Sequence, residues 1–180
     1  MVYVHLADGF EEIEAVTIVD VLRRAGIETK TISIMSKKEV TGAHGMTLSA
    51  DILFREADYE KCEMIVLPGG MPGTTNLGNH KGLTENIKYF AKHNKWIAAI
   101  CAAPMILGQL GLLEGKDATI YVGMESYLTG ANYSEKKVVV DGNIITSKGP
   151  ATAAAFALEL VTLLLNKNSS DKVKEGMLIE

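Results

Sequence analysis

Cysteine is scarce in this 180-residue chain, and its scarcity bears on where the protein works. Only Cys62 and Cys101 are present, and neither belongs to a CxxC pair. Disulfide-stabilised secreted domains carry more cysteines at paired spacings, so two isolated cysteines favour free thiols and a reducing compartment. We therefore expect a cytoplasmic protein.

Long apolar runs and an excess of basic residues are also missing. No hydrophobic run approaches the roughly 20 residues of a membrane-spanning helix. Residues 1–8 lack the basic region of a signal peptide and reach an acidic residue at Asp8. The net charge of −4 is unlike the basic face that nucleic-acid binding needs. We expect a globular protein with neither a membrane partner nor a specific nucleic-acid site.

Motifs for metals and nucleotides are absent as well. The four histidines (His5, His44, His80 and His93) show no metal-ligand spacing. There is no P-loop, and the glycines within residues 69–73 do not match a dinucleotide-binding fingerprint. We therefore expect no metal and no cofactor.

Strand-like and helix-like patterns alternate along the chain, which is long enough to form one domain over residues 1–180. This alternation predicts an α/β fold with a mostly parallel sheet covered by helices on both faces. The expected strands span residues 2–7, 28–35, 63–67, 96–100 and 118–122, with hairpins at 41–50 and 138–146. The expected helices span residues 11–25, 83–94, 105–110, 151–165 and 171–177.

The segment from residue 96 to residue 110 carries the clearest candidate for chemistry. An apolar run ends at Cys101, and two alanines and Pro104 lead directly into a helical pattern. This layout is typical of a nucleophile elbow, in which a buried strand presents a thiol at a helix N-terminus. Partial positive charge at that terminus favours thiolate, so we expect a lowered thiol pKa. The competing interpretation is an inert cysteine packed at a strand–helix junction.

Two other loops are expected to meet this elbow, because ligands of parallel sheets bind at the C-terminal ends of the strands. They span residues 8–14 and 68–75. Gly69 and Gly70 end a buried strand as part of a tight turn. Glycines here would also let backbone N–H groups approach a ligand and form an oxyanion hole with the amide of Ala102.

The first of these loops is acidic. Asp8 is predicted to cap the following helix, with Glu11 completing a capping-box-like pattern and Glu12 favoured by the helix dipole. Glu14 lies further along, among apolar neighbours. It belongs either to a solvated helix face or to a buried site beside the thiol, where burial would keep its carboxyl group protonated.

Five short motifs lie in order along the chain: GFEEIE (9–14), LRRAGI (22–27), IVLPGG (65–70), AAICAAP (98–104) and ITSKGP (145–150). Together they are highly specific. By these motifs the whole chain resembles the ThiJ/PfpI superfamily. It is most similar to the branch that contains the Parkinsonism-associated protein deglycase and its bacterial relatives.

The resemblance implies a flavodoxin-like three-layer sandwich with Cys101 as nucleophile and Glu14 as its protonated hydrogen-bond partner. It implies that the amides of Gly70 and Ala102 face the reacting oxygen. It also implies a homodimer built partly from the first helix, which places Arg24 near the partner subunit's site. From the residues alone, the same basic helix end would simply complement the helix dipole.

Three positions qualify what the resemblance implies. Protease-like members of the superfamily have histidine immediately after the cysteine, where this chain has Ala102. Many members of the deglycase branch carry a further histidine, and alignment places Tyr121 there. A Cys–His dyad is therefore not expected, and acid–base chemistry falls to Glu14. His44, where some relatives have arginine, is either a plain loop residue or part of a pH-sensitive anion site.

The resemblance implies a cofactor-independent enzyme of the glyoxalase III or protein deglycase type. It would convert methylglyoxal, or the adducts of methylglyoxal on glycated protein, to lactate through Cys101. An oxidative-stress sensor with an oxidisable Cys101 is one alternative, and a redox-dependent chaperone is another. Peptidase activity ranks last, because Ala102 stands where the histidine would be.

Overall fold

The structure, a computed structural model, describes residues 1–179. Its central sheet contains β1 (Val2–Leu6), β2 (Thr29–Ser33), β5 (Ile52–Leu53), β6 (Met64–Leu67), β7 (Trp96–Ile100), β10 (Val138–Asp141) and β11 (Ile144–Ser147). The strands run in the order β10-β11-β7-β6-β1-β2-β5. All neighbours are parallel except the hairpin of β10 and β11. The predicted α/β fold with a mostly parallel sheet is confirmed.

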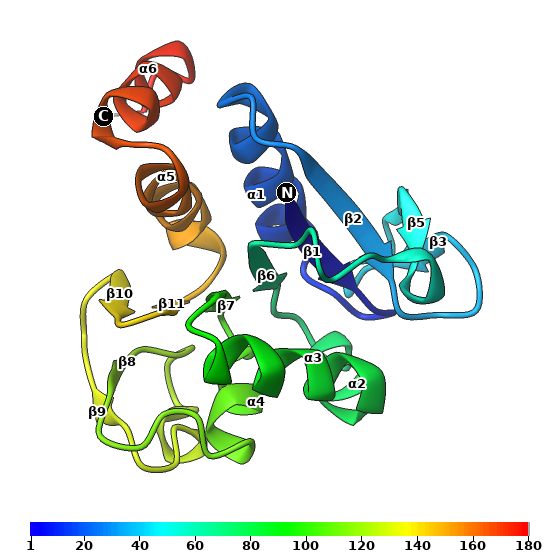
Figure 1. The fold of residues 1–180 in the computed structure, drawn as a ribbon, viewed down its shortest axis with the longest axis vertical. Coiled ribbons are helices and arrows are strands. Elements are labelled where there is room, and N and C mark those ends of the chain that lie inside the picture. The colour runs from blue at the N-terminus through cyan, green and yellow to red at the C-terminus, as the bar shows by residue number, and fades with distance from the viewer. Residues whose placement is uncertain (180) are drawn as a thin grey trace.

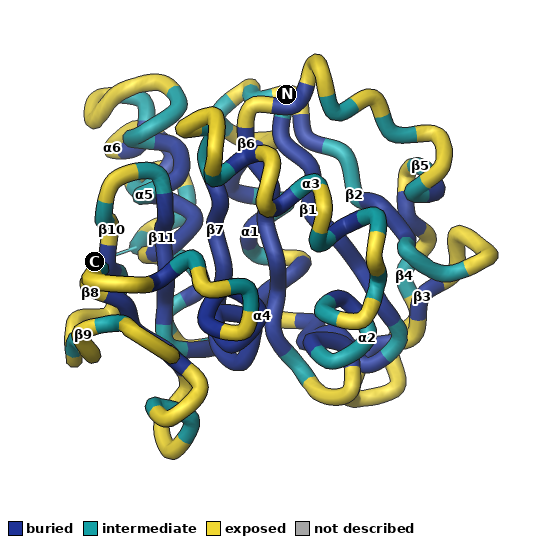
Figure 2. Tube along the Cα trace, turned by 60° about the horizontal axis from the view of Figure 1, so that its bottom comes forward, coloured by how far each residue is buried: buried dark blue, intermediate teal, exposed yellow. Residues whose placement is uncertain are grey.

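Helices cover both faces of this sheet (Figure 1). One face carries α1 (Glu12–Arg24), α5 (Ala153–Leu164) and α6 (Lys167–Gly176), and the other carries α2 (Gly73–Asn79), α3 (Lys81–Lys92) and α4 (Pro104–Gln109). Side chains alternate along β1, so Val2 and Val4 pack toward the first layer and Tyr3 toward the second. Figure 2 shows the resulting buried strands at the centre of the molecule. Within residues 1–179, no helix has the length and apolar character needed to cross a bilayer.

Several short elements lie outside the central sheet and its covering helices. They are the antiparallel pair β3 (Glu39–Thr41) and β4 (Thr47–Ser49), the parallel pair β8 (Asp117–Ala118) and β9 (Asn132–Tyr133), and the 3₁₀ turns η1 (Phe54–Glu56), η2 (Glu125–Tyr127) and η3 (Pro150–Thr152). The hairpin predicted within residues 41–50 corresponds to β3 and β4.

The strand predicted at residues 118–122 is wrong. Only β8 forms there, and it pairs with β9 outside the central sheet. The backbone amide of Thr119 donates to Thr146 Oγ1 at 2.9 Å, and the amide of Tyr121 donates to the carbonyl of Cys101 at 2.9 Å. These bonds replace a strand ladder and hold the segment over the end of β7.

The start of α1 also differs from the prediction. Glu11, rather than Asp8, is the N-cap, and its Oε2 accepts from the backbone N–H of Glu14 at 2.7 Å. Asp8 instead accepts from the backbone N–H of Thr41 at 2.9 Å, so it ties β1 to the β3–β4 hairpin.

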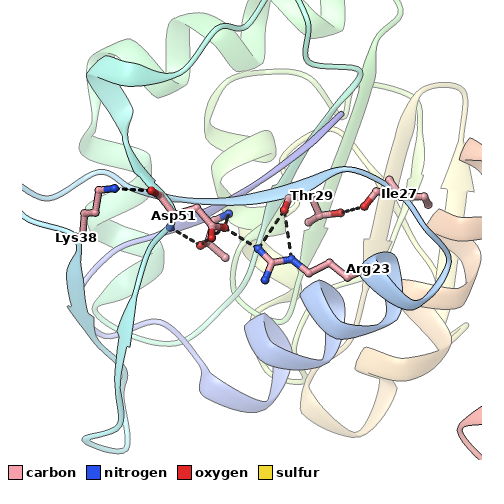
Figure 3. A network of polar contacts seen from close by, with 6 residues as sticks. Arg23, Ile27, Thr29, Lys38 and Asp51 are labelled. Carbon is pink, nitrogen blue, oxygen red and sulfur yellow. Dashed lines mark hydrogen bonds and ion pairs between the residues drawn. The ribbon is translucent and has the colours of Figure 1, made fainter.

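The far end of α1 is fastened by a network around Asp51 (Figure 3). Arg23 donates to Asp51 Oδ2 at 2.7 Å and to the carbonyl of Thr29 at 3.1 Å. Lys38 Nζ donates to the Asp51 carbonyl at 2.6 Å. Arg23 therefore joins α1 to β2 and to the segment before β5, in addition to complementing the helix dipole.

Candidate active site

The carboxyl ends of β1, β6 and β7 bring the three predicted loops together. The amide of Glu11 donates to the Gly69 carbonyl at 2.9 Å, and the amide of Gly69 donates to Glu14 Oε2 at 2.7 Å. A side chain at Gly69 would collide with Cβ of Cys101, so the β6 and β7 loops lie in direct contact. The meeting of these loops, expected from topology, is confirmed.

Cys101 occupies a sharp turn between β7 and α4. Its φ is +63°, a left-handed conformation that non-glycine residues rarely adopt and that costs about 1–3 kcal/mol. Its backbone amide donates to the Ser147 carbonyl of β11 at 2.9 Å, which holds the strained turn in place. The residue is only 8% exposed, so the elbow lies almost entirely beneath the surface. This geometry fits the predicted nucleophile elbow.

Glu14 is completely buried beside the thiol, and the solvated-face interpretation is therefore wrong. One carboxyl oxygen accepts from the Gly69 amide, while Oε1 has no hydrogen-bond partner within residues 1–179. A buried polar atom without a partner is rare and costly in folded proteins. The free oxygen is available to exchange a proton with the neighbouring sulfur or with a bound molecule.

Burial dominates the titration of this pair. It raises the pKa of Glu14 to about 7, against the lowering effect of the Gly69 amide and of Cys101. Burial and the charge of Glu14 raise the pKa of Cys101 to about 12, against the lowering effect of the Gly70 and Ala102 amides. The lowered thiol pKa predicted from the helix N-terminus is therefore wrong. The thiol is mostly buried, and α4 has only six residues with which to offset that burial.

The two groups are close enough to titrate as one coupled pair. Burial raises the pKa values of both groups, so that loss of both protons from the pair is disfavoured. Above neutral pH, sulfur and carboxyl thus hold one proton between them. A nucleophilic thiolate forms whenever that proton moves to Glu14.

Backbone amides complete the polar surroundings of the sulfur. Hydrogen bonds from the amides of Gly70 and Ala102 are the favourable contributions to a negative charge on Cys101. Gly70 has a φ of +87°, and a side chain there would collide with the backbone of residues 9–11. Glycine is therefore required for this loop to present its amide, as the sequence had indicated for the Gly69–Gly70 turn.

Tyr121 lies beside the elbow, but its ring takes no part in the polar pair. Tyr121 is 44% exposed, and its ring packs against Gly149. No histidine of residues 1–179 is hydrogen-bonded to Cys101 or Glu14. The acid–base capacity around the sulfur thus resides in Glu14.

Gly149 is the site position that sequence reasoning missed. An ideal Cβ placed on it would lie 4.0 Å from Cys101 Sγ. Its loop is fixed by Thr152, whose Oγ1 accepts from the Gly149 amide at 3.1 Å and lies 2.7 Å from Ser147 Oγ. The pairing of β11 with β7 could have revealed it, because a parallel neighbour of β7 must end at the same edge of the sheet.

His44 is engaged by carboxylates. Its Nδ1 lies 2.9 Å from Glu12 Oε2, and its backbone amide donates to Glu12 Oε1 at 2.7 Å. Although burial acts against it, hydrogen bonds from His44 lower the pKa of Glu12, and the same contact raises the pKa of His44. Two carboxylates beside the imidazole disfavour a bound anion, so the plain loop interpretation of His44 fits best.

Among residues 1–179, the side chains of Glu11, Glu12 and His44 form the one group that could hold a metal ion, since their ligand atoms lie within 4.8 Å of one another. Both carboxylates already accept backbone hydrogen bonds, Glu11 from Glu14 and Glu12 from His44 and Met46. These bonds start α1 and anchor the β3–β4 hairpin, which accounts for the acidic residues without a ligand.

Arg24 and Cys62 lie away from the pair. Arg24 forms an exposed ion pair with Asp20 at 2.6 Å, roughly 15 Å along α1 from Glu14 at 1.5 Å per residue. It cannot serve the site of its own chain. Cys62 is fully buried, donates to the Met64 carbonyl at 3.2 Å, and has a pKa raised to about 12 by burial.

Comparison with known proteins places this geometry in context. The chain is 38% identical over 179 residues to Protein DJ-1 homolog B of Arabidopsis thaliana, covering 99% of this chain but 41% of that protein. It is 36% identical over 177 residues to Protein dj-1beta of Drosophila melanogaster, covering 97% of this chain and 94% of the relative. The chain therefore spans less than half of the plant relative and nearly all of the insect one.

Structural similarity is equally extensive. The oxidized DJ-1 structure of Toxoplasma gondii superposes with a TM-score of 0.94 at 38% identity, covering 98% of this chain and 97% of that one. Its similarity confirms the flavodoxin-like sandwich. Residues 1–163 match the family described as DJ-1/PfpI. This chain, with its cysteine elbow and buried glutamate, belongs to the DJ-1/PfpI family.

Proposed function

We propose that this protein is a cysteine-dependent enzyme that converts methylglyoxal, free or as an adduct on a thiol or amine, to lactate. The observation that carries the proposal is the buried Glu14 carboxyl beside Cys101 at the strained elbow, where burial raises the pKa of the carboxyl to about 7. A thiol with an adjacent carboxyl base is an activated nucleophile, and a carboxyl pKa near 7 suits a general acid–base catalyst.

In the first step, Glu14 takes the thiol proton as Cys101 Sγ attacks the aldehyde carbon. A C–S bond forms, and the carbonyl π electrons move to oxygen. The amides of Gly70 and Ala102 are positioned to stabilise that oxyanion, as they do a charge on the sulfur. Protonation of the oxyanion by Glu14 gives a hemithioacetal and restores the carboxylate.

In the second step, Glu14 removes the proton from the former aldehyde carbon. The electron pair forms an enediolate. Glu14 returns the proton to the adjacent carbon, and the hydroxyl proton of the former aldehyde carbon passes to the neighbouring oxygen, which leaves a lactoyl thioester. Water then attacks the thioester carbonyl, which releases lactate and the Cys101 thiol. The net reaction is methylglyoxal plus water to lactate, with no external oxidant or reductant. Every proton transfer uses a group found beside the sulfur.

Peptidase chemistry is not supported by the same arrangement. A cysteine peptidase needs a group that protonates the leaving amine, most often an imidazole paired with the thiol. Here the residue after Cys101 is Ala102, and Tyr121 presents a ring against Gly149 instead of an imidazole. The dicarbonyl reaction has no amine leaving group to protonate when methylglyoxal is free.

Redox sensing is the second candidate, favoured by the same amide donors at the sulfur. Those amides, with a protonated Glu14, would stabilise a sulfinate formed at Cys101. Limited peroxide should then oxidise Cys101 before the fully buried Cys62. Mass spectrometry that finds equal or preferred oxidation at Cys62 would remove this candidate.

The proposed partner is a second copy of this chain, as the family resemblance implies. Ile13 and Val16 lie on one face of α1 and are 58% and 47% exposed. Val16 also lines a surface hollow of about 290 Å³ with Leu48 of β4. Apolar side chains grouped on an exposed helix face are typical of protein interfaces. With two free thiols in the described chain, we propose a reducing compartment such as the cytoplasm.

The test of the proposed function follows methylglyoxal loss and lactate formation together. Wild-type protein should form lactate in step with substrate loss. Cys101→Ser should form none, whereas Cys62→Ser is the matched control and should retain wild-type rates. Substrate loss without lactate, or equal lactate from wild type and Cys101→Ser, would overturn the proposal.

A further inference from the structure

The strained backbone of Cys101 is held on both sides by neighbouring segments. Its amide donates to the carbonyl of Ser147, at the carboxyl end of β11, at 2.9 Å. Its carbonyl accepts from the amide of Tyr121 at 2.9 Å. A left-handed φ of +63° persists only where the surrounding structure over-determines the backbone. The direction in which Cys101 presents its sulfur therefore depends on whatever fixes Ser147 and Tyr121.

Ser147 is fixed through its own side chain. The residue is fully buried, and its Oγ donates to the carbonyl of Lys137 at 2.7 Å. A hydroxyl has one proton to donate, and a carbonyl can only accept. The hydroxyl of Thr152, which lies 2.7 Å from Ser147 Oγ, is therefore the donor in that second contact.

The Thr152 hydroxyl faces the loop that precedes α5 instead of the helix. Thr152 is the N-cap of α5, a position where a threonine oxygen usually accepts from an amide of its own helix. Within the described chain, its side chain makes no such bond to α5. Its Oγ1 instead accepts from the Gly149 amide at 3.1 Å and lies 2.9 Å from the Gly149 carbonyl. One hydroxyl thus ties together both ends of the 147–149 loop.

This loop meets Cys101 at two points. The Ser147 carbonyl binds the Cys101 amide, and an ideal Cβ on Gly149 would lie 4.0 Å from Cys101 Sγ. Thr152 reaches Cys101 only through these two residues. Loss of its hydroxyl would leave the Gly149 amide and Ser147 Oγ without a partner, which polar groups in the interior of a protein rarely tolerate.

We propose that Thr152 is a positioning residue for the Cys101 nucleophile. Its hydroxyl fixes the 147–149 loop, and the loop holds the Cys101 amide and so directs the sulfur toward Glu14. The effect on turnover rests on the proposed function, whereas the effect on the Cys101 backbone does not. The mechanism above assigns no part to Thr152.

The contact at Tyr121 provides an internal reference. The segment that carries Tyr121 is anchored by the amide of Thr119, which donates to Thr146 Oγ1 at 2.9 Å. That anchor does not involve Thr152. Loss of the Thr152 hydroxyl should therefore loosen the Cys101 amide and leave the Tyr121 amide in place.

Three variants test the proposal. Thr152→Val replaces the hydroxyl with a methyl group, and Thr152→Ser retains the hydroxyl and should restore wild-type behaviour. Thr162→Val is the matched control. Thr162 is also a half-buried threonine of α5, and its hydroxyl donates to the Leu158 carbonyl at 3.0 Å, about 15 Å further along the helix at 1.5 Å per residue.

The first arm measures amide hydrogen exchange by NMR on ¹⁵N-labelled protein. In Thr152→Val, the Cys101 amide should exchange at least about tenfold faster than in wild type, while the Tyr121 amide stays within about twofold. A general loss of stability would accelerate both amides, because both would then exchange through the same opening. Both should stay at wild-type rates in Thr152→Ser and Thr162→Val. Equal acceleration of the two amides in Thr152→Val, or no acceleration, would overturn the proposal.

The second arm measures lactate formation from methylglyoxal. Thr152→Val should lower kcat about tenfold with KM within about twofold, because a misdirected nucleophile weakens an interaction made only in the transition state. This loss is smaller than the roughly 100-fold that a displacement of about 1 Å can cause. Thr152→Ser and Thr162→Val should retain wild-type kcat.

The two arms separate this proposal from the proposed function. Wild-type kcat in Thr152→Val, despite faster exchange at Cys101, would overturn the positioning role alone. A wild-type protein that forms no lactate would overturn the proposed function and the role of Thr152 in turnover. The exchange rates would still decide whether Thr152 holds the Cys101 backbone.

Discussion

At the scale of single residues, Glu14 sets the chemistry of the site. Its carboxyl is buried to a degree that acidic side chains reach only when they are paired or protonated. One oxygen is held by the Gly69 amide, and the other has no partner in the described part of the chain. The residue is thus both fixed in position and free to exchange a proton.

Glu14 should also make the unfolding free energy of the protein depend on pH. Its folded-state pKa of about 7 lies above the ordinary 4.5, so the folded protein binds more protons than the unfolded chain between these pH values. The resulting stabilisation is present below about pH 4.5 and is lost as the pH rises through about 7. Relative to Glu14→Gln, wild type should lose roughly 3 kcal/mol of unfolding free energy between pH 4.5 and pH 8.

Urea unfolding of both proteins at several pH values measures this difference. Glu14→Gln keeps the size and polarity of the side chain but cannot titrate. The difference between the two proteins therefore reports the effect of proton binding by Glu14 on stability. Parallel stability curves for the two proteins would mean that Glu14 titrates normally, and the shared-proton description of the site would be wrong.

Sequence reasoning located Cys101 and the glycine turn because each is marked by a local pattern. It assigned the N-cap of α1 to Asp8 instead of Glu11, because either carboxylate can cap a helix. Which of the two does so depends on the course of the backbone before α1. Asp8 is drawn away by the amide of Thr41, a contact across 33 positions of sequence. The direction of the thiol pKa shift was also missed, since burial of Cys101 depends on the whole surrounding loop cluster.

At the scale of elements, the carboxylate of Asp51 links the segment between β4 and β5 to α1 and to β2. Asp51 Oδ2 accepts from Arg23 and from both the backbone amide and hydroxyl of Thr31, at 2.7, 2.7 and 2.8 Å. Burial opposes the charge, but the hydrogen bonds from Thr31 and the charge of Arg23 lower the pKa of Asp51. These bonds fix the hairpin against the sheet edge.

Removal of this carboxylate should loosen the segment. Asp51→Ala leaves the Thr31 amide and Arg23 without their acceptor and should destabilise the protein by about 1 kcal/mol, a figure kept small because the side chain is partly solvent-screened. Asp20→Ala, which removes an exposed partner of Arg24, is the control and should cost less than ~0.5 kcal/mol. Denaturant unfolding midpoints of the two variants and the wild type measure these losses. If the two variants lose the same unfolding free energy, the Asp51 network does not stabilise the protein.

Elements with a clear hydrophobic period were predictable, and those stabilised by tertiary contacts were not. Helix α2 was missed because residues 73–79 are rich in glycine and polar residues, which disfavour an isolated helix. It forms because Asn76 donates to the Asp8 carbonyl at 2.9 Å and the Gly73 amide donates to the Gly9 carbonyl at 3.1 Å. Neither contact leaves a mark in the local sequence.

At the scale of the whole molecule, the sheet order explains why the site exists. Placing β6 between β1 and β7 brings the glutamate, the glycine turn and the cysteine to one edge. The alternation of strands and helices was enough to predict this architecture and the edge that carries the site. Strand order itself, and hence the contribution of β11 through Gly149, required the structure.

The exposed apolar side chains on one face of α1 predict that the protein forms a dimer. Val16→Asp puts a charge into the apolar surface and should convert the proposed dimer to a monomer at micromolar concentration, because a desolvated, unpaired carboxylate is costly at an interface. Sedimentation velocity measures the change. Tyr89→Asp, at an exposed position of α3 on the opposite face of the sheet, should leave the dimer intact. A wild-type monomer at this concentration would refute the dimer and any role for Arg24 across it.

The most direct test of the central claim is the pH profile of kcat/KM for methylglyoxal, with lactate as the readout. If Cys101 and Glu14 act as one proton-sharing pair, kcat/KM should rise tenfold per pH unit below about pH 7 and level off above it, as the first proton leaves the pair. Glu14→Gln should lose at least about 100-fold in activity, the usual contribution of a general acid–base group, together with this pH dependence. A profile that is flat from pH 5 to pH 8, with Glu14→Gln as active as wild type, would contradict the account.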